Sequence, residues 1–204
     1  MSTALTHSSY AAEHDEESNE RLEFLGDAVV NLVAADVIMS TYGEFNEGQC
    51  SQVRAQVVNE ATFAEVATEL GIPELMRLGK GEDKSGGRQR AALQADAFEA
   101  VIAAIYIDRG FDEAYEFVAD LLVPRISLAA TDPSGGDPKT RLIQWAEAEG
   151  LPAPVYVAVA HGPVHATTFE VTVSVGERVS ATGRGSTKRA AESAAAAAAW
   201  RSRT

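Results

Sequence analysis

A proline- and glycine-rich segment at residues 129–138 divides this chain of 204 residues into two differently patterned parts. The segment runs Ala-Ala-Thr-Asp-Pro-Ser-Gly-Gly-Asp-Pro, a composition typical of linkers and turns. Before it, apolar residues recur every three or four positions, the spacing of helices; after it, several stretches alternate as strands do. We therefore expect one domain at 1–128, a linker at 129–136 and a second domain at 137–204.

The part before the linker is predicted to be all-α. Helices are expected at 20–42, 51–70, 91–109 and 112–128, with glycines or prolines at several of their ends. Pro124 should bend or break the last of these helices, because proline removes a backbone donor.

The part after the linker is predicted to be a small α+β domain of order α-β-β-β-α. Asp137 and Pro138 suit the N-cap and first position of a helix that ends at Gly150. The three strands that we expect are 155–159, 168–175 and 178–182, and the closing helix is 187–201.

The charge of the chain is unevenly distributed. Residues 1–132 carry 9 Lys and Arg against 24 Asp and Glu, whereas residues 133–204 carry 8 against 6. A net charge of −13 is unusual for a nucleic-acid binder, because binding to phosphates relies on Lys and Arg. On charge alone the chain would be an acidic protein with no role on nucleic acids. Whether it binds nucleic acids must therefore be judged from where the acidic and basic residues lie.

The cellular compartment is predicted from three features: apolar stretches, a secretory signal and cysteines. No stretch approaches the roughly 20 apolar residues of a membrane helix, so we expect no membrane partner. No secretory signal is expected at the start. The single cysteine, Cys50, allows no internal disulfide and suits a reducing cytoplasm.

Three carboxylates are spaced along one face of the first long predicted helix. Glu20, Glu23 and Asp27 stand at positions i, i+3 and i+7, among apolar neighbours. Crowded carboxylates repel each other and resist desolvation, so such a cluster normally needs a cation. This helix alone leaves the choice between a metal site and a solvated acidic face open.

A second carboxylate pair favours the metal site. Asp96 and Glu99 stand at i and i+3 in a strongly apolar helix, where a solvated face would not be expected. Two helices that each present such acids predict an all-oxygen site for Mg²⁺ or Mn²⁺ inside a helical bundle. Divalent cations at such sites support the hydrolysis of phosphodiesters.

Four blocks of the sequence resemble the ribonuclease III family of bacterial type, in the family's order. They are residues 4–10 (Ala-Leu-Thr-His-Ser-Ser-Tyr), 19–27 (Asn-Glu-Arg-Leu-Glu-Phe-Leu-Gly-Asp), 78–87 and 95–102. The block at 19–27 matches the family signature without a mismatch. Residues 78–88 lack the Gly-Lys-Ser/Thr ending of a phosphate-binding P-loop, and we interpret them as a flexible basic loop that touches RNA.

The resemblance implies a role for each acid. The residues that it implies as metal ligands are Glu23, Asp96 and Glu99. The residues that it implies as catalytic acids are Asp27 and Glu99, with Glu20 and Glu47 as supporting acids. Phe24 matches the aromatic residue that enters a socket in the partner subunit of the family's homodimer. The alternative interpretation is that Phe24 packs in the core of its own domain.

The second domain resembles the double-stranded RNA-binding domain. The residues that this implies as RNA-binding are Thr140, Gln144, His165, Thr187, Lys188 and Arg189. The last three have a direct physical reason, because the start of a helix presents unpaired N–H groups that favour phosphate.

The resemblance thus predicts an endoribonuclease that hydrolyses double-stranded RNA with Mg²⁺, for which Mn²⁺ could substitute, and leaves 5′-phosphomonoesters. We expect a cytoplasmic homodimer that acts in rRNA and mRNA processing and decay. The alternative is a non-catalytic double-stranded RNA-binding protein of the same fold. An acidic helical scaffold unrelated to RNA would leave the second domain unexplained.

Overall fold

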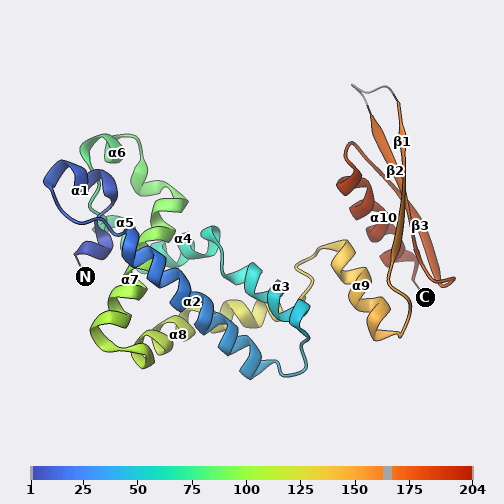
Figure 1. Cartoon of the computed structure of the whole chain (residues 1–204), viewed down its shortest axis with the longest axis horizontal. Helices are drawn as coiled ribbons and strands as arrows, with labels where there is room; N and C mark the ends of the chain where they lie inside the picture. Colours follow the sequence, from blue (N-terminus) through green and yellow to red (C-terminus); the bar gives the residue numbers. More distant parts are fainter. Residues whose placement is uncertain (1, 163–166, 204) are drawn as a thin grey trace. The chain divides into compact units, whose positions relative to one another are not determined.

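The computed structural model describes residues 2–162 and 167–203, and the chain forms two compact units, Met1–Pro133 and Ser134–Thr204 (Figure 1). The first is all-α and the second is α+β, which confirms the predicted fold class. No helix within the described residues is both long enough and apolar enough to cross a bilayer.

Every named element of the first unit within the described residues is a helix. They are η1 (Thr3–Leu5), α1 (Ser8–His14), α2 (Glu20–Thr41), α3 (Glu47–Val57), α4 (Glu60–Glu69), α5 (Ile72–Leu75), α6 (Lys80–Lys84), η2 (Gly87–Gln89), α7 (Ala91–Arg109) and α8 (Phe111–Ala130). The α8 helix extends two residues into the segment predicted as a linker.

Helices α2 and α7 form the centre of this unit, and they cross at unusually short range. A Cβ atom placed on Gly26 of α2 would lie 1.8 Å from the carbonyl oxygen of Glu99 on α7. Only glycine fits at such an approach. On either side of the crossing, buried apolar side chains such as Val30 and Phe98 fill the interface. The core of the unit therefore depends on one glycine.

The single helix predicted at 51–70 is wrong, because the chain forms α3 and α4 with a break at Asn59. The Asn59 side chain accepts a hydrogen bond from the backbone N–H of Thr62 at 3.0 Å, and so caps α4. Its amide nitrogen donates to the carbonyl of Gln56 at 2.9 Å and so satisfies the end of α3. One asparagine thus ends one helix and starts the next.

Pro124 does not break α8, which runs from Phe111 to Ala130. The buried side chains Ala114, Val118, Leu122 and Ile126 recur every four residues through the proline. Packing of this stripe outweighs the lost backbone hydrogen bond.

The segment predicted as a flexible basic loop contains α6 and η2 and is fastened to α1. The backbone N–H of Gly79 donates to Ser9 Oγ at 2.9 Å, and that of Lys80 donates to Glu13 Oε1 at 2.9 Å. The predicted loop is therefore partly helical and tied to α1, and its contact with RNA stays a prediction.

The second unit consists of two helices and one three-stranded sheet. Its elements are α9 (Pro138–Ala148), β1 (Val155–His161), β2 (Thr168–Val175), β3 (Val179–Gly185) and α10 (Lys188–Ser202). The strands pair antiparallel in the order β1-β2-β3, with Val157 opposite Thr172 and Thr172 opposite Thr182. Helix α10 packs on β2 and β3 and also contacts α9.

Small residues bring α10 close to the sheet. A Cβ atom on Gly183 of β3 would lie 2.1 Å from the backbone nitrogen of Ala195. The facing side of α10 is made of buried alanines, among them Ala191 and Ala195. The alanine run at residues 194–199 thus supplies buried side chains to this packing surface.

We expect Gly26→Ala to lower the free energy of unfolding of the helical unit by about 3 kcal/mol, the upper end of the range for overpacking, because the new methyl group meets backbone. Far-UV circular dichroism of the full chain measures this unfolding. Both tryptophans, Trp145 and Trp200, lie in the second unit, so their fluorescence should show an unchanged transition there.

Gly81→Ala is the matched control, because a Cβ atom on Gly81 of α6 meets nothing within 4 Å. Equal stability of Gly26→Ala and Gly81→Ala would contradict the close crossing of α2 and α7.

Candidate functional site

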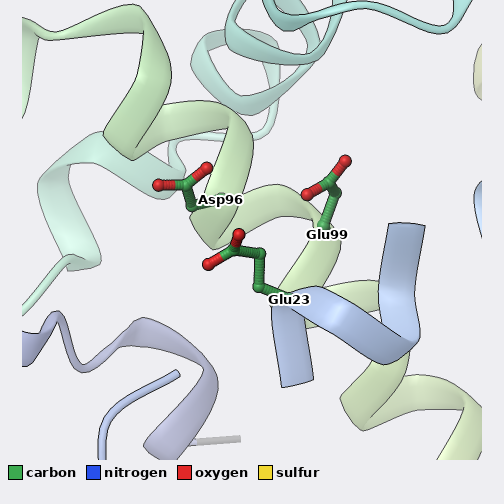
Figure 2. Close-up of side chains that lie close together, drawn as sticks. All are labelled: Glu23, Asp96 and Glu99. Atoms are coloured by element: carbon green, nitrogen blue, oxygen red, sulfur yellow. The ribbon is translucent and has the colours of Figure 1, made fainter. Parts of the chain in front are cut away.

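Three carboxylates meet where α2 crosses α7, and we call Glu23, Asp96 and Glu99 the acid trio. One oxygen from each residue lies within 4.8 Å of the others. Figure 2 shows the Glu23 side chain reaching from α2 toward α7, where Asp96 and Glu99 stand one turn apart. The sequence predicted these three residues as metal ligands, and the fold brings them together.

The crossing at Gly26 explains why the trio can form. Glu23 lies three residues before Gly26, on the side of α2 that faces α7, and Glu99 contributes the backbone that Gly26 touches. Because the two helices approach so closely, carboxylates on short side chains reach each other across the interface. All three residues are half-buried.

Burial and mutual repulsion make the trio costly to ionise. Burial, followed by the charges of Asp27, Glu23 and Asp96, raises the pKa of Glu99 to about 8. Burial also raises the pKa of Glu23, and the charge of Asp96 adds to the effect. Burial raises the pKa of Asp96, and the nearby His7 offsets only part of this shift. A cation at this point would relieve all three.

The donor set fits a hard divalent cation. Every ligand atom that the trio offers is a carboxylate oxygen, the type that Mg²⁺ and Mn²⁺ prefer. Within residues 2–162 and 167–203, no Lys or Arg forms an ion pair with the trio. A bound cation would therefore compete with no basic side chain of the described residues.

Asp27 and Glu20 lie on α2 beside the trio and are exposed. The carboxylate of Asp27 accepts a hydrogen bond from Asn31 Nδ2 at 2.8 Å, and its charge helps raise the pKa of Glu99. Glu20 accepts from Ser18 Oγ at 2.8 Å. Both acids therefore sit at the rim of the trio without belonging to it.

Glu47 lies apart from the trio, in the first turn of α3. It is exposed and accepts a hydrogen bond from Ser51 Oγ at 2.9 Å. It lines a groove of about 420 Å³ between the end of α2 and α3, together with apolar side chains that include Met39, Tyr42 and Phe45.

Phe24 is not a core residue, because its side chain is 82% exposed. Leu32 and Met39 are also exposed on α2, at 56% and 70%. Their spacing places all three on one side of the helix. Helix α2 thus carries a stripe of exposed apolar side chains that begins at Phe24, directly after Glu23.

His7 has a structural place that the sequence did not reveal. Its Nδ1 accepts from the backbone N–H of Ser9 at 3.2 Å and caps α1. Ser9 Oγ lies 2.8 Å from the same nitrogen and accepts from Gly79. The available signal was the block at 4–10, in which a histidine precedes two serines, but the contact with residue 79 is invisible in a linear sequence.

The predicted RNA-binding residues of the second unit that the structure describes lie on α9 and at the start of α10. Thr140 and Gln144 are half-buried on α9, and the backbone N–H of Thr140 donates to the capping side chain of Asp137 at 2.7 Å. Ile143, between them, is 39% exposed. His165 lies outside the described residues.

The start of α10 has the features expected of a phosphate contact. Thr187 caps the helix by accepting from the backbone N–H of Ala190 at 3.1 Å. Lys188 and Arg189 follow directly, and both are exposed. A positively charged pair thus stands at the positive end of a helix.

Two family models match the chain. Residues 1–126 match the model described as Ribonuclease-III-like, and residues 138–203 match the double-stranded RNA binding motif.

Individual proteins are similar over nearly the whole chain. Ribonuclease 3 of Thermobifida fusca is 46% identical over 202 residues, which cover 98% of this chain and 84% of that protein. Ribonuclease 3 of Streptomyces coelicolor is 44% identical over 98% of this chain and 72% of its own length. A solved nuclease domain of ribonuclease III from Campylobacter jejuni is 35% identical, with a TM-score of 0.57 over 61% of this chain and 85% of that one. The chain therefore belongs to the ribonuclease III family of endoribonucleases, whose nuclease domain it joins to a double-stranded RNA-binding motif.

Proposed function

We propose that this chain hydrolyses double-stranded RNA at the acid trio, with Glu23, Asp96 and Glu99 holding Mg²⁺, for which Mn²⁺ can substitute. The observation that carries this proposal is the convergence of three half-buried carboxylates within 4.8 Å at one helix crossing. The products that we expect carry 5′-phosphomonoesters.

The protein's own residues divide the chemistry between them. A bound divalent cation supplies positive charge that polarises the phosphodiester and eases deprotonation of water. Glu99, whose pKa is about 8 without that charge, becomes a carboxylate ligand when the charge is present. Asp27, which is exposed beside the trio and accepts a hydrogen bond from Asn31, would orient the attacking water and accept its proton. Glu20 adds a further acid near the same rim.

The second unit is proposed to hold the duplex. Thr140 and Gln144 on α9 and Thr187, Lys188 and Arg189 on α10 would contact it, together with His165. Such domains recognise the shape of A-form RNA through 2′-hydroxyls and phosphates. This assigns affinity to the net-basic unit and cleavage to the acidic one.

A homodimer is proposed from the apolar stripe on α2. An exposed phenylalanine costs free energy in water, and Phe24 stands at 82% exposure beside the acid trio. We infer that it enters the groove between α2 and α3 of a second copy, at whose edge Glu47 lies. That arrangement would bring Glu47 of one copy near the trio of the other and provide two cutting sites for the two RNA strands.

The alternative is a protein that binds double-stranded RNA without cutting it. The complete trio, together with Asp27, argues against this alternative. Incubation with long duplex RNA and Mg²⁺, with and without a chelator, separates the two. Cleavage that the chelator abolishes supports the nuclease, and binding without cleavage supports the alternative. A role in rRNA and mRNA processing and a cytoplasmic location also belong to this proposal.

Glu99→Gln should abolish detectable cleavage at millimolar Mg²⁺ while duplex binding survives, because it removes a ligand charge and leaves the second unit untouched. A gel shift and a cleavage assay on one duplex preparation measure both properties. The control is Glu65→Gln, the same change at an exposed site on α4. Near-normal cleavage by Glu99→Gln would refute the proposed metal site.

The raised pKa of Glu99 predicts how stability depends on pH in metal-free protein. An acid whose pKa rises from 4.5 unfolded to about 8 folded binds more protons when folded, so its contribution to stability is full below pH 4.5 and falls as pH rises toward about 8. Glu99→Gln should therefore melt a few degrees above the parent near pH 8 and no higher near pH 4.5. Mg²⁺ at the higher pH should raise the melting temperature of the parent more than that of the variant. Parallel curves for the two proteins over this range would contradict the burial of Glu99.

Phe24→Asp should weaken self-association by at least about tenfold, because buried aromatic residues dominate the free energy of interfaces. Analytical ultracentrifugation over a dilution series measures this, and circular dichroism should show an intact helical unit. Leu75→Asp, at another strongly exposed apolar position in the same unit, is the control. Dimers of unchanged affinity in Phe24→Asp would remove this residue from the interface.

A further inference from the structure

One carboxylate joins the two helices of the RNA-binding unit. Glu192 lies one turn into α10, and its Oε2 accepts a hydrogen bond from Lys139 Nζ of α9 at 2.6 Å. Its other oxygen, Oε1, lies 4.0 Å from Nζ of Lys188. The Glu192 side chain is only 16% exposed, whereas the acids of four other ion pairs among the described residues are at least 30% exposed. This pair is therefore more shielded from water than a typical surface pair.

The Lys139 side of the pair is also fixed. Lys139 Nζ lies 5.0 Å from the centre of the Tyr156 ring on β1. Burial raises the pKa of Tyr156 to about 12, and its hydroxyl finds no hydrogen-bond partner among the described residues. The hydrogen bond from Lys139 lowers the pKa of Glu192, so the carboxylate is charged. The contact thus connects α9, α10 and the sheet at one point.

The position of this point matters because the proposed RNA contacts lie on both sides of it. Thr140 follows Lys139 directly on α9, and Lys188 and Arg189 lie one turn before Glu192 on α10. Helix α9 also meets α10 through a buried apolar cluster that includes Leu142 and Ala195, and the Arg141 guanidinium lies 5.4 Å from the centre of the Trp200 ring. A hydrogen-bonded ion pair fixes direction as well as distance.

We propose that Glu192 is a positioning residue for double-stranded RNA, which holds the contacts of α9 and those of the α10 N-terminus at the spacing that one duplex requires. This inference rests on the proposed function, in which the second unit binds the duplex. Glu192 touches no RNA itself. It acts through Lys139 and the two helices, because a duplex-binding domain must meet successive grooves at once.

Charge alone predicts the opposite effect, which makes the proposal testable. An acid beside Lys188 repels phosphate, so neutralising it should tighten binding if Glu192 had no positioning role. The positioning role predicts weaker binding from the same change. The sign of the effect separates the two.

The experiment measures binding of the full chain to one duplex RNA in chelator, where cleavage is prevented. Glu192→Gln should bind on the order of three- to tenfold more weakly, the range that one shielded ion pair or hydrogen bond controls. The slope of log affinity against log salt should stay unchanged, because no phosphate contact is lost. In Mg²⁺, the KM for cleavage should rise while kcat holds.

Two comparison variants define the scale. Glu177→Gln makes the same charge change in the exposed turn between β2 and β3, and should leave binding unchanged or slightly tighter. Lys188→Gln removes a proposed phosphate contact, and should lower the salt slope by about one.

A variant of constant charge tests position alone. Glu192→Asp keeps the charge but withdraws the carboxylate from Lys139, so it should also weaken binding. Lys139→Arg, which keeps a donor, should bind more tightly than Lys139→Met. The double variant Lys139→Met/Glu192→Gln should be no weaker than the weaker single variant, because the two side chains act as one unit.

The fluorescence of Trp145 and Trp200 confirms that the unit of each variant is folded at the assay temperature. Binding by Glu192→Gln that equals or exceeds that of the parent would overturn the inference, as would unchanged binding by Glu192→Asp. A parent that fails to bind duplex RNA at all would instead overturn the proposed function.

Discussion

The contact between Gly26 and the backbone of Glu99 is the constraint on which the nuclease unit depends. A Cβ atom at this point would lie 1.8 Å from a carbonyl oxygen, so α2 and α7 can cross at this distance only without a side chain. The same crossing buries Val30 and Phe98 and brings Glu23 up to Asp96 and Glu99. Packing and chemistry are therefore coupled here. A change that separates the helices would both loosen the core and disperse the ligands.

That coupling explains why a repelling cluster survives within a stable fold. The free energy gained by burying the apolar residues of α2 and α7 offsets the cost of placing three carboxylates beside them. The raised pKa of Glu99 records that cost, because the proton is retained to about pH 8 in the absence of a cation. A bound divalent ion would offset that cost and return stability to the unit.

Local periodicity predicted the fold class and the helices α2 and α7, and motifs on both helices, with the resemblance to ribonuclease III, predicted the acid trio. Prediction failed where a single side chain changes roles or where distant segments meet. Asn59 looks like an ordinary polar residue in a helical pattern, yet it divides that pattern into α3 and α4. The tie from Ser9 to Gly79, which fastens the segment taken for a loop, joins residues 70 positions apart. Periodicity carries no information about such contacts, and the roles of Asp27, Glu47 and Phe24 stay predictions for the same reason.

Two glutamates show how surroundings decide what one residue type does. Glu99 is half-buried among other acids, so its pKa rises to about 8. Its charged form is therefore favoured only when an external cation lies beside it. Glu192 is also shielded, but Lys139 donates to it at 2.6 Å and lowers its pKa, so its cation is supplied by the chain itself. The first arrangement, in which the charged form of the side chain is favoured only beside a cation, suits a metal ligand. The second satisfies the charge internally, which suits a fixed joint between α9 and α10.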